Sequence, residues 1–284
     1  MVYVDQPPMY FELFPEDLEN DIYVAGESFG GQYVPYVARA ILKRNENLTK
    51  VDDEYKLKGI MIGNGLVSPN EQFLSLIDYF KDHSLIDDSN PNWANINKAQ
   101  SVCQEIVDGE ETSLNENKAQ VCTSLLGLFL NATRDESAPA DQQYLNIYDY
   151  KLHDAFPTCG FSYPPLTEAN KFLNRWEVQA DLNVERPVNY TVCNTVVQKT
   201  FTAPNSPPDK NNFAGIISTT GSIGVVEEEK AGWVLQDRNL TFINIFNASH
   251  YVPYSQPTMA KYLLDFITSE TTEDIEGFIS SSDE

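Results

Sequence analysis

One pentapeptide has the residue types and spacing of a nucleophile that attacks a carbonyl carbon. Gly26-Glu27-Ser28-Phe29-Gly30 is a G-x-S-x-G pattern, in which small residues allow a sharp turn that exposes the serine hydroxyl. The backbone N–H of Phe29, at the start of the following helix, would stabilise a negatively charged oxygen. The alternative is a glycine-rich turn in which Ser28 only caps a helix. We favour the nucleophile elbow, because a strand and a helix are predicted on its two sides.

A serine nucleophile needs a base, and three histidines could supply it. His83 lies in a polar helical segment and is expected to be solvated, while His153 falls in a large insertion. His250 follows a predicted strand and comes after Ser28, as the hydrolase order Ser…Asp/Glu…His requires. Its alternative is a surface-loop histidine beside a glycosylation sequon. As a base, His250 would remove the Ser28 proton and return it to the leaving amine.

The third member of such a triad is not evident. Asp209, Glu227 to Glu229 and Asp237 lie between the insertion and His250, but none follows a recognisable apolar strand pattern. We therefore nominate no orienting carboxylate from the sequence.

Two strand patterns must position the pentapeptide. Asp21 to Ala25 is a short run rich in β-branched and aromatic residues, which predicts a buried strand before Ser28. A second strand is predicted at Leu57 to Ile62. The helix expected between them has apolar residues at the 3.6-residue period, with a proline in its first turn: Val34, Pro35, Val37, Ala38, Ile41 and Leu42.

These patterns predict an α/β protein with an open sheet that is interrupted by a large, mostly helical insertion. Before His250 a strand is predicted at Leu240 to Phe246, and after it a helix begins near Pro257. The predicted segments are a first part of the core (1–66), a helical cap (67–200), an irregular linker (201–230), a second part of the core (231–268) and an acidic disordered tail (269–284).

Composition excludes several classes of protein. The 284 residues include 42 Asp and Glu against 19 Lys and Arg, a net charge of −23 that would repel a nucleic-acid backbone. Hydrophobic residues at 42% exclude global disorder. The longest apolar run, Leu125 to Leu130, is too short to span a bilayer, and no signal peptide is expected in the opening residues.

Cysteines and sequons bear on the compartment. The four cysteines contain no C-x-x-C pair, so we expect no metal site, and no motif calls for a cofactor. They are either buried free thiols or two disulfides with three possible connectivities: Cys103, Cys122, Cys159 and Cys193. Five N-x-S/T sequons, together with the cysteines, favour the secretory pathway over the cytosol: Asn47, Asn131, Asn189, Asn239 and Asn247.

Several stretches resemble the serine carboxypeptidase family. The segments GESFGGQYVP around Ser28, LKGIMIGNG at 57–65 and NASHYVPYSQP at 247–257 carry this resemblance. Others are similar to the family's fungal pheromone-processing branch: FPEDL at 14–18, SLIDDSNPN at 84–92, LNIYDYKLHDAFPTCG at 145–160 and DRNLTFINIFNASH at 237–250. The resemblance implies an α/β-hydrolase fold and removal of C-terminal Lys or Arg from propeptides in the late Golgi. Vacuolar or secreted enzymes are the alternatives.

The resemblance also implies roles for single residues. Ser28 would be the nucleophile, His250 the base and Phe29 an oxyanion N–H donor, with Gly31 in the matching turn. Glu27 would belong to a proton-sharing carboxyl pair that recognises the C-terminal carboxylate of the substrate. Tyr251 would line the pocket of the leaving residue. The acidic surface would attract peptides with basic C-termini.

The chain also departs from the family. The oxyanion segment and the second acid of the carboxyl pair are expected upstream of Met1, with the usual partner of Cys193. The Asp motif G-D-x-D has no counterpart before His250. We therefore expect an incomplete central sheet in a chain with terminal and internal losses. Two alternative functions follow: an impaired fragment or pseudoenzyme glycoprotein, and an esterase or acyltransferase that uses the same Ser and His.

Overall fold

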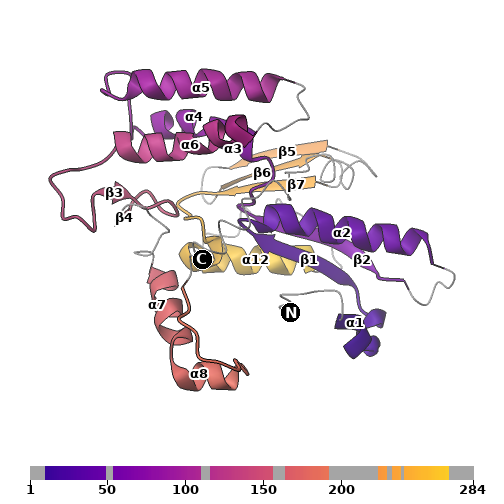
Figure 1. The fold of residues 1–284 in the computed structure, drawn as a ribbon. Coiled ribbons are helices and arrows are strands. Elements are labelled where there is room, and N and C mark those ends of the chain that lie inside the picture. The colour runs from indigo at the N-terminus through magenta and orange to yellow at the C-terminus, as the bar shows by residue number, and fades with distance from the viewer. Residues whose placement is uncertain are drawn as a thin grey trace. The chain divides into compact units, whose positions relative to one another are not determined.

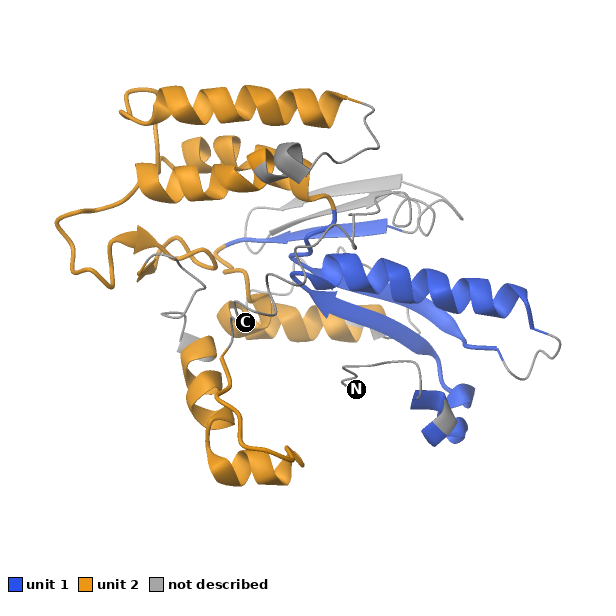
Figure 2. Ribbon diagram, in the orientation of Figure 1, with its two compact units in different colours: residues 1–67, 208–246, 268–284 blue, residues 68–207, 247–267 orange. Residues whose placement is uncertain are grey.

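The computed structural model describes residues 10–48, 54–109, 116–155, 164–191, 223–228, 232–237 and 240–268. The chain forms two compact units, and each contains segments that are distant in the sequence (Figure 2). The first unit comprises residues 1–67, 208–246 and 268–284, and the second comprises residues 68–207 and 247–267. The chain therefore leaves the first unit twice, for residues 68–207 and for residues 247–267.

A β–α–β element forms the centre of the first unit (Figure 1). Its members are β1 (Ile22–Glu27), α2 (Gly30–Glu46) and β2 (Leu57–Gly63), and they are preceded by α1 (Tyr10–Leu13) and the short 3₁₀ helix η2 (Pro15–Glu19). β1 and β2 are parallel, so the helix between them has to cross over the sheet. The last pair in the register is Glu27 opposite Gly63, which places the end of β2 beside the predicted elbow.

Helix α2 packs on both strands through the apolar positions that the sequence predicts. Val34 and Ala38 are buried, one turn apart. Pro35 lies inside the helix in its second turn, not in the first as the pattern predicted, because the helix begins at Gly30. A proline there removes one backbone donor of the helix.

A second sheet of the first unit corrects the predicted linker at 201–230. Residues 201–222 lie outside the described residues, but Ile223–Glu228 form strand β5, which is antiparallel to β6 (Gly232–Asp237). β6 in turn pairs with β7 (Leu240–Ile245), which agrees with the predicted strand before His250. The run of glutamates after Val226 predicts irregular structure, whereas pairing between neighbouring strands stabilises the extended backbone.

The second unit is mostly helical. Its elements are α3 (Pro69–Leu74), α4 (Leu76–Asp82), α5 (Trp93–Asp108), α6 (Glu116–Ala132), β3 (Tyr144–Leu145), β4 (His153–Asp154), α7 (Pro164–Leu173), α8 (Trp176–Asp181), α11 (Val252–Ser255) and α12 (Pro257–Thr268). Helices α5 and α6 lie side by side with α3 and α4 against them (Figure 1). Their core contains fully buried Ile96, Leu125 and Phe129.

A disulfide joins the two long helices of this core. Cys103 of α5 is bonded to Cys122 of α6, with a Cα–Cα distance of 5.0 Å, and both residues are 0% exposed. The alternative of buried free thiols is therefore wrong for this pair. Cys159 and Cys193 lie outside the described residues.

Two amide side chains hold the α7–α8 hairpin to the segment that follows it. Gln179 is buried and donates to the carbonyl oxygens of Leu173 and Val188, while its own oxygen accepts from the Val188 amide. Asn174 makes the same kind of pair with Tyr190, at 2.8 and 2.9 Å. These bonds replace the sheet or helix partners that the segment lacks.

Two surface features bear on the predicted compartment. Asn47, Asn131, Asn189 and Asn247 are exposed, whereas Asn239 and the tail at 269–284 lie outside the described ranges. No described helix combines the length and the apolar character that crossing a bilayer demands.

Candidate active site

The backbone of Ser28 adopts the left-handed conformation expected of a nucleophile elbow. Its φ is 57°, a value that non-glycine residues rarely adopt and that is concentrated at functional turns. The residue lies between the end of β1 and the start of α2. Its N–H donates to Gly63 O at 3.0 Å, and its carbonyl oxygen accepts from Leu66 N at 2.7 Å and from Gly31 N at 3.0 Å. The strained backbone is therefore held on both sides of Ser28.

Three positions at this turn have no room for a β-carbon. A Cβ on Gly31 would lie 2.6 Å from Leu66 N and 2.8 Å from the carbonyl carbon of Gly65. A Cβ on Gly26 would lie 2.8 Å from Val34 Cγ2, and one on Gly65 would lie 2.2 Å from Ile62 Cγ2. Glycine at 31 and 65 therefore allows the first turn of α2 to approach the backbone after β2 closely.

The residues beside Ser28 match parts of the predicted chemistry. Phe29 is the N-cap residue of α2, where backbone N–H groups have no partner within the helix. Phe29 is 39% exposed, and the centroid of its ring lies 5.2 Å from that of the Tyr33 ring. Glu27 is half-buried at the end of β1, and burial raises the pKa of its carboxyl group, because desolvation disfavours the charged form.

His250 lies in the second unit, in the turn between β7 and α11. Its backbone N–H donates to Tyr148 O at 2.8 Å. Its ring stacks on the Tyr148 ring with a centroid distance of 5.1 Å and an interplanar angle of 27°, and Tyr251 contacts it edge-on at 5.2 Å. Burial lowers the pKa of the imidazole and so favours its neutral, proton-accepting form.

A buried polar pair positions Tyr148. Asn146 and Asp154 are each 3% exposed, and Asn146 Nδ2 donates to Asp154 Oδ2 at 3.3 Å. The side-chain oxygen of Asn146 accepts from the Tyr148 N–H at 2.9 Å, and Asp154 Oδ1 accepts from Ala155 N at 2.8 Å. Residues 146–152 connect β3 to β4, and we call this connection together with β4 the 146–154 turn. Neither Asn146 nor Asp154 was predicted, because polar residues in a turn give no sign of burial.

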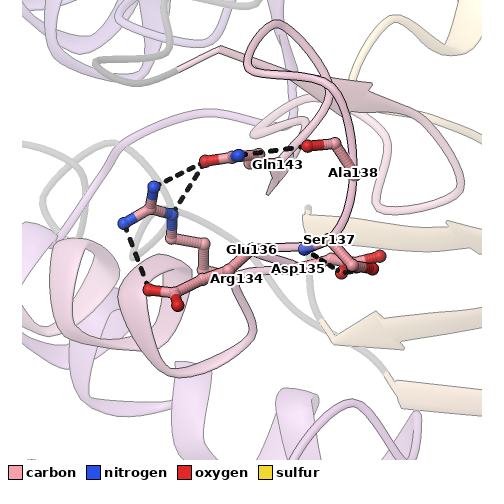
Figure 3. A network of polar contacts seen from close by, with 6 residues as sticks. All are labelled: Arg134, Asp135, Glu136, Ser137, Ala138 and Gln143. Carbon is pink, nitrogen blue, oxygen red and sulfur yellow. Dashed lines mark hydrogen bonds and ion pairs between the residues drawn. The ribbon is translucent and has the colours of Figure 1, made fainter.

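A second network orders the loop that leads from α6 into β3 (Figure 3). The Arg134 guanidinium donates to Gln143 Oε1 at 3.0 and 2.6 Å and contacts Glu136 at 3.5 Å. Gln143 in turn donates to Ala138 O at 3.1 Å. The side chains are largely exposed, so their contribution to stability is modest. The network does fix the path of the chain just before the 146–154 turn.

The predicted residues thus fall into two groups. Glu27, Ser28, Phe29 and Gly31 belong to one unit, together with residues 63–67, and we call this group the nucleophile half. His250 and Tyr251 belong to the other unit with the 146–154 turn, and we call this group the base half.

His83 and His153, the other histidines considered, are both exposed. In the described part of the chain, no three His, Cys, Asp or Glu residues are grouped to hold a metal ion.

The interval before His250 contains strands that were not predicted. β5 ends at Glu228 and β6 ends at Asp237, so the expectation that no acid there follows a strand is wrong. Asp237 pairs with Leu240 at the start of β7. Glu228 pairs with Gly232, which pairs with Ile245 at the end of β7. The register therefore places Glu228, and not Asp237, at the end of the sheet from which the chain continues to His250.

A solved structure has the same fold over most of the chain. The crystal structure of a prohormone-processing carboxypeptidase from Saccharomyces cerevisiae matches with a TM-score of 0.78 and 30% identity, covering 91% of this chain and 64% of that one. That protein has the α/β-hydrolase fold, which confirms the predicted fold class.

The sequence comparisons identify the family. The serine carboxypeptidase family profile matches residues 8–223 and 210–270, so the chain belongs to this family. Pheromone-processing carboxypeptidases are similar to it: that of Candida dubliniensis is 36% identical over 315 residues (94% of this chain, 46% of the relative), and that of Debaryomyces hansenii is 37% identical over 307 residues (93% and 45%). The chain spans about half the length of the curated relatives that it matches.

Proposed function

We propose that this protein is a serine-type carboxypeptidase that releases C-terminal residues from peptides through an acyl-enzyme intermediate. The observation that carries the proposal is the left-handed backbone of Ser28, between β1 and α2, in a member of the serine carboxypeptidase family. A serine that only capped α2 would not need this conformation, since cap residues favour extended backbone.

The reaction assigns a role to each half. Ser28 Oγ attacks the carbonyl carbon of the last peptide bond, and His250 accepts the hydroxyl proton. The C–N bond then breaks, and the leaving amine takes that proton from the imidazolium. Water attacks the acyl ester by the same route, which returns Ser28 to its hydroxyl form. The Phe29 N–H stabilises the oxyanion in both steps.

Three further residues are proposed to bind the substrate. Glu27 recognises the free C-terminal carboxylate, and its raised pKa supports this role, because a protonated carboxyl group donates a hydrogen bond to another carboxylate. Tyr251 lines the pocket of the leaving residue. Gly31 allows the close approach of backbone that keeps the elbow in place.

We also propose the substrate class and the compartment. The relatives include pheromone-processing enzymes, and the net charge of −23 favours peptides with C-terminal Lys or Arg. The buried disulfide and the four exposed sequons support a route through the secretory pathway, with processing in the trans-Golgi.

The test uses the whole chain from a secretory host and a peptide ending in Lys-Arg at mildly acidic pH. We expect release of the terminal residue, measured by mass spectrometry, and its loss in a Ser28→Ala variant. The same peptide with an amidated C-terminus should react far more slowly. No release from a folded chain would contradict the proposal and favour a pseudoenzyme. Equal cleavage of the amidated peptide would favour an esterase or acyltransferase.

A further inference from the structure

The side chain of Gln32 joins α2 to the backbone that follows β2. Gln32 occupies the first turn of the helix and is only 6% exposed. Its Nε2 donates to Leu66 O at 2.6 Å and to Val67 O at 3.2 Å. We call this pair of hydrogen bonds the Gln32 bridge. It connects residues that are 34 and 35 positions apart in the sequence.

The segment that the bridge contacts also holds Ser28. Gly63 O accepts from the Ser28 N–H, and Leu66 N donates to the Ser28 carbonyl oxygen. Leu66 therefore bonds to the nucleophile through its amide and to Gln32 through its carbonyl oxygen. A displacement of Leu66 would therefore alter the hydrogen bond that holds the Ser28 carbonyl oxygen.

Burial makes these hydrogen bonds consequential. A carbonyl oxygen that loses its donor away from water bears a desolvation penalty, and the Gln32 side chain, which is 6% exposed, covers both carbonyl oxygens. Among the described residues, Gln32 Oε1 accepts no hydrogen bond although it is buried. The two bonds that Gln32 donates are therefore formed although its own side-chain oxygen is left without a donor.

From this arrangement we infer that Gln32 is a positioning residue of the proposed reaction: its amide fixes residues 66–67, and through them the direction in which Ser28 presents its hydroxyl. It does not touch the substrate. The inference rests on the proposed function for its catalytic part, whereas the bridge itself can be tested without any peptidase activity.

Two substitutions separate this role from simple packing. Gln32→Met keeps the volume and removes the donor, so the rate of Ser28 acylation should fall about tenfold or more at every pH. In Gln32→Glu the ionised carboxylate faces two carbonyl oxygens, which raises the pKa of the new carboxyl group. The protonated carboxyl group has one O–H donor, which can bond to one of the two carbonyl oxygens. The rate relative to the unmodified chain should therefore recover as the pH falls.

The reactivity of the Ser28 hydroxyl, on which acylation depends, is measured as the rate of its phosphonylation by a fluorescent phosphonate that labels nucleophilic serines. The rate of each variant is divided by the rate of the unmodified chain at the same pH. In this ratio the effect of His250 protonation on the labelling rate cancels, because it is common to both chains. Gln72→Glu is the matched control, because Gln72 is exposed and its oxygen accepts from Ser68 N at 2.8 Å, a bond that a carboxylate also makes. Its relative rate should stay flat with pH.

Unfolding curves provide the measurement that does not depend on catalysis. Because the folded-state pKa of the carboxyl group in Gln32→Glu is raised, its stabilising contribution is present at low pH and lost as the pH rises through that pKa. The melting temperature of this variant should therefore fall relative to the unmodified chain as the pH increases. Parallel melting curves, or a Gln32→Met variant that is labelled at the normal rate, would overturn the inference. An unmodified chain that is not labelled would contradict the proposed function, and melting curves would still decide the bridge.

Discussion

The two groups of candidate residues, the nucleophile half and the base half, are built by different means. In the nucleophile half, backbone groups hold Ser28, and glycines bring those groups close enough to bond. In the base half, side chains hold His250: an aromatic ring stacks on the imidazole, and a buried amide–carboxylate pair fixes the turn that carries this ring. Both halves fix one reactive group, but only in the base half does a side chain contact that group directly, whereas Gln32 acts on Ser28 through the backbone of residues 66–67.

This difference predicts how each half responds to mutation. A backbone arrangement tolerates no added atom, because the neighbouring main chain cannot move aside as a flexible side chain can. A side-chain arrangement tolerates changes of volume better, yet it is sensitive to the loss of a single donor or acceptor.

The largest effect is expected from Gly31→Ala. Its Cβ would lie 2.6 Å from Leu66 N, so the variant should lose about 3 kcal/mol of unfolding free energy and nearly all labelling of Ser28. The matched control is Gly30→Ala, where nothing lies within 4 Å of the added atom and the change should stay within about 0.5 kcal/mol. Urea unfolding measures both. Equal losses of unfolding free energy in the two variants would contradict the idea that close backbone contacts at Gly31 hold the nucleophile half.

The next effect concerns the base half. Asn146→Ala removes the acceptor of the Tyr148 N–H and the donor to buried Asp154, which should cost about 1–3 kcal/mol. The value of kcat should also fall, about tenfold, because Tyr148 positions His250.

Asn174→Ala is the control for Asn146→Ala. Asn174 forms a similar pair of bonds in the α7–α8 hairpin, where it is exposed. This variant should be less stable by about 1 kcal/mol and have an unchanged kcat. If kcat falls equally in both variants, the effect of Asn146 is one of general stability.

A smaller effect concerns pH. Burial lowers the pKa of His250, so the acidic limb of kcat/KM should lie below the ordinary histidine value of 6.5. The stability linked to this neutral imidazole is present above the unfolded-state pKa and is lost as the pH falls through the folded-state pKa. Tyr148→Ala exposes the His250 ring to water and should therefore move the acidic limb of kcat/KM to higher pH. Tyr79→Ala removes a ring that contacts exposed His83, with a centroid distance of 4.1 Å, and should leave the acidic limb in place.

The smallest effect is expected at Glu27. Because burial raises the pKa of this carboxyl group, the associated stability is lost as the pH rises through the folded-state pKa. Glu27→Gln should therefore be more stable than the unmodified chain at neutral pH, and the difference should vanish in acid. Thermal melts at both pH values measure it, and the same substitution at an exposed glutamate, Glu54→Gln, is the control.

The nucleophile half was largely predictable from the sequence. A β-branched run before G-x-S-x-G and a 3.6-residue period after it predict the strand and helix, and β1 and α2 lie there. These signals are local. Gln32 was missed because its burial depends on residues 66–67, and nothing within its own helix indicates that contact.

The base half was less predictable for a related reason. His250 could be selected from the chain order and the preceding strand, but its ring partner Tyr148 is 102 positions earlier in the numbering. Strands β5 and β6 were missed because a run of glutamates hides the alternation of apolar residues, and pairing with β7 supplies what local propensity lacks.

The disulfide between α5 and α6 also constrains the order of events during biosynthesis. Both cysteines are fully buried between helices, so an oxidant or an isomerase has no access to the sulfur atoms after the core has packed. The bond must therefore form while the helices can still separate. A chain folded in a reducing host would close its core around two thiols, and later exposure to oxidant would repair it only through local unfolding. The redox state at the time of synthesis thus determines which form of the protein a purification yields.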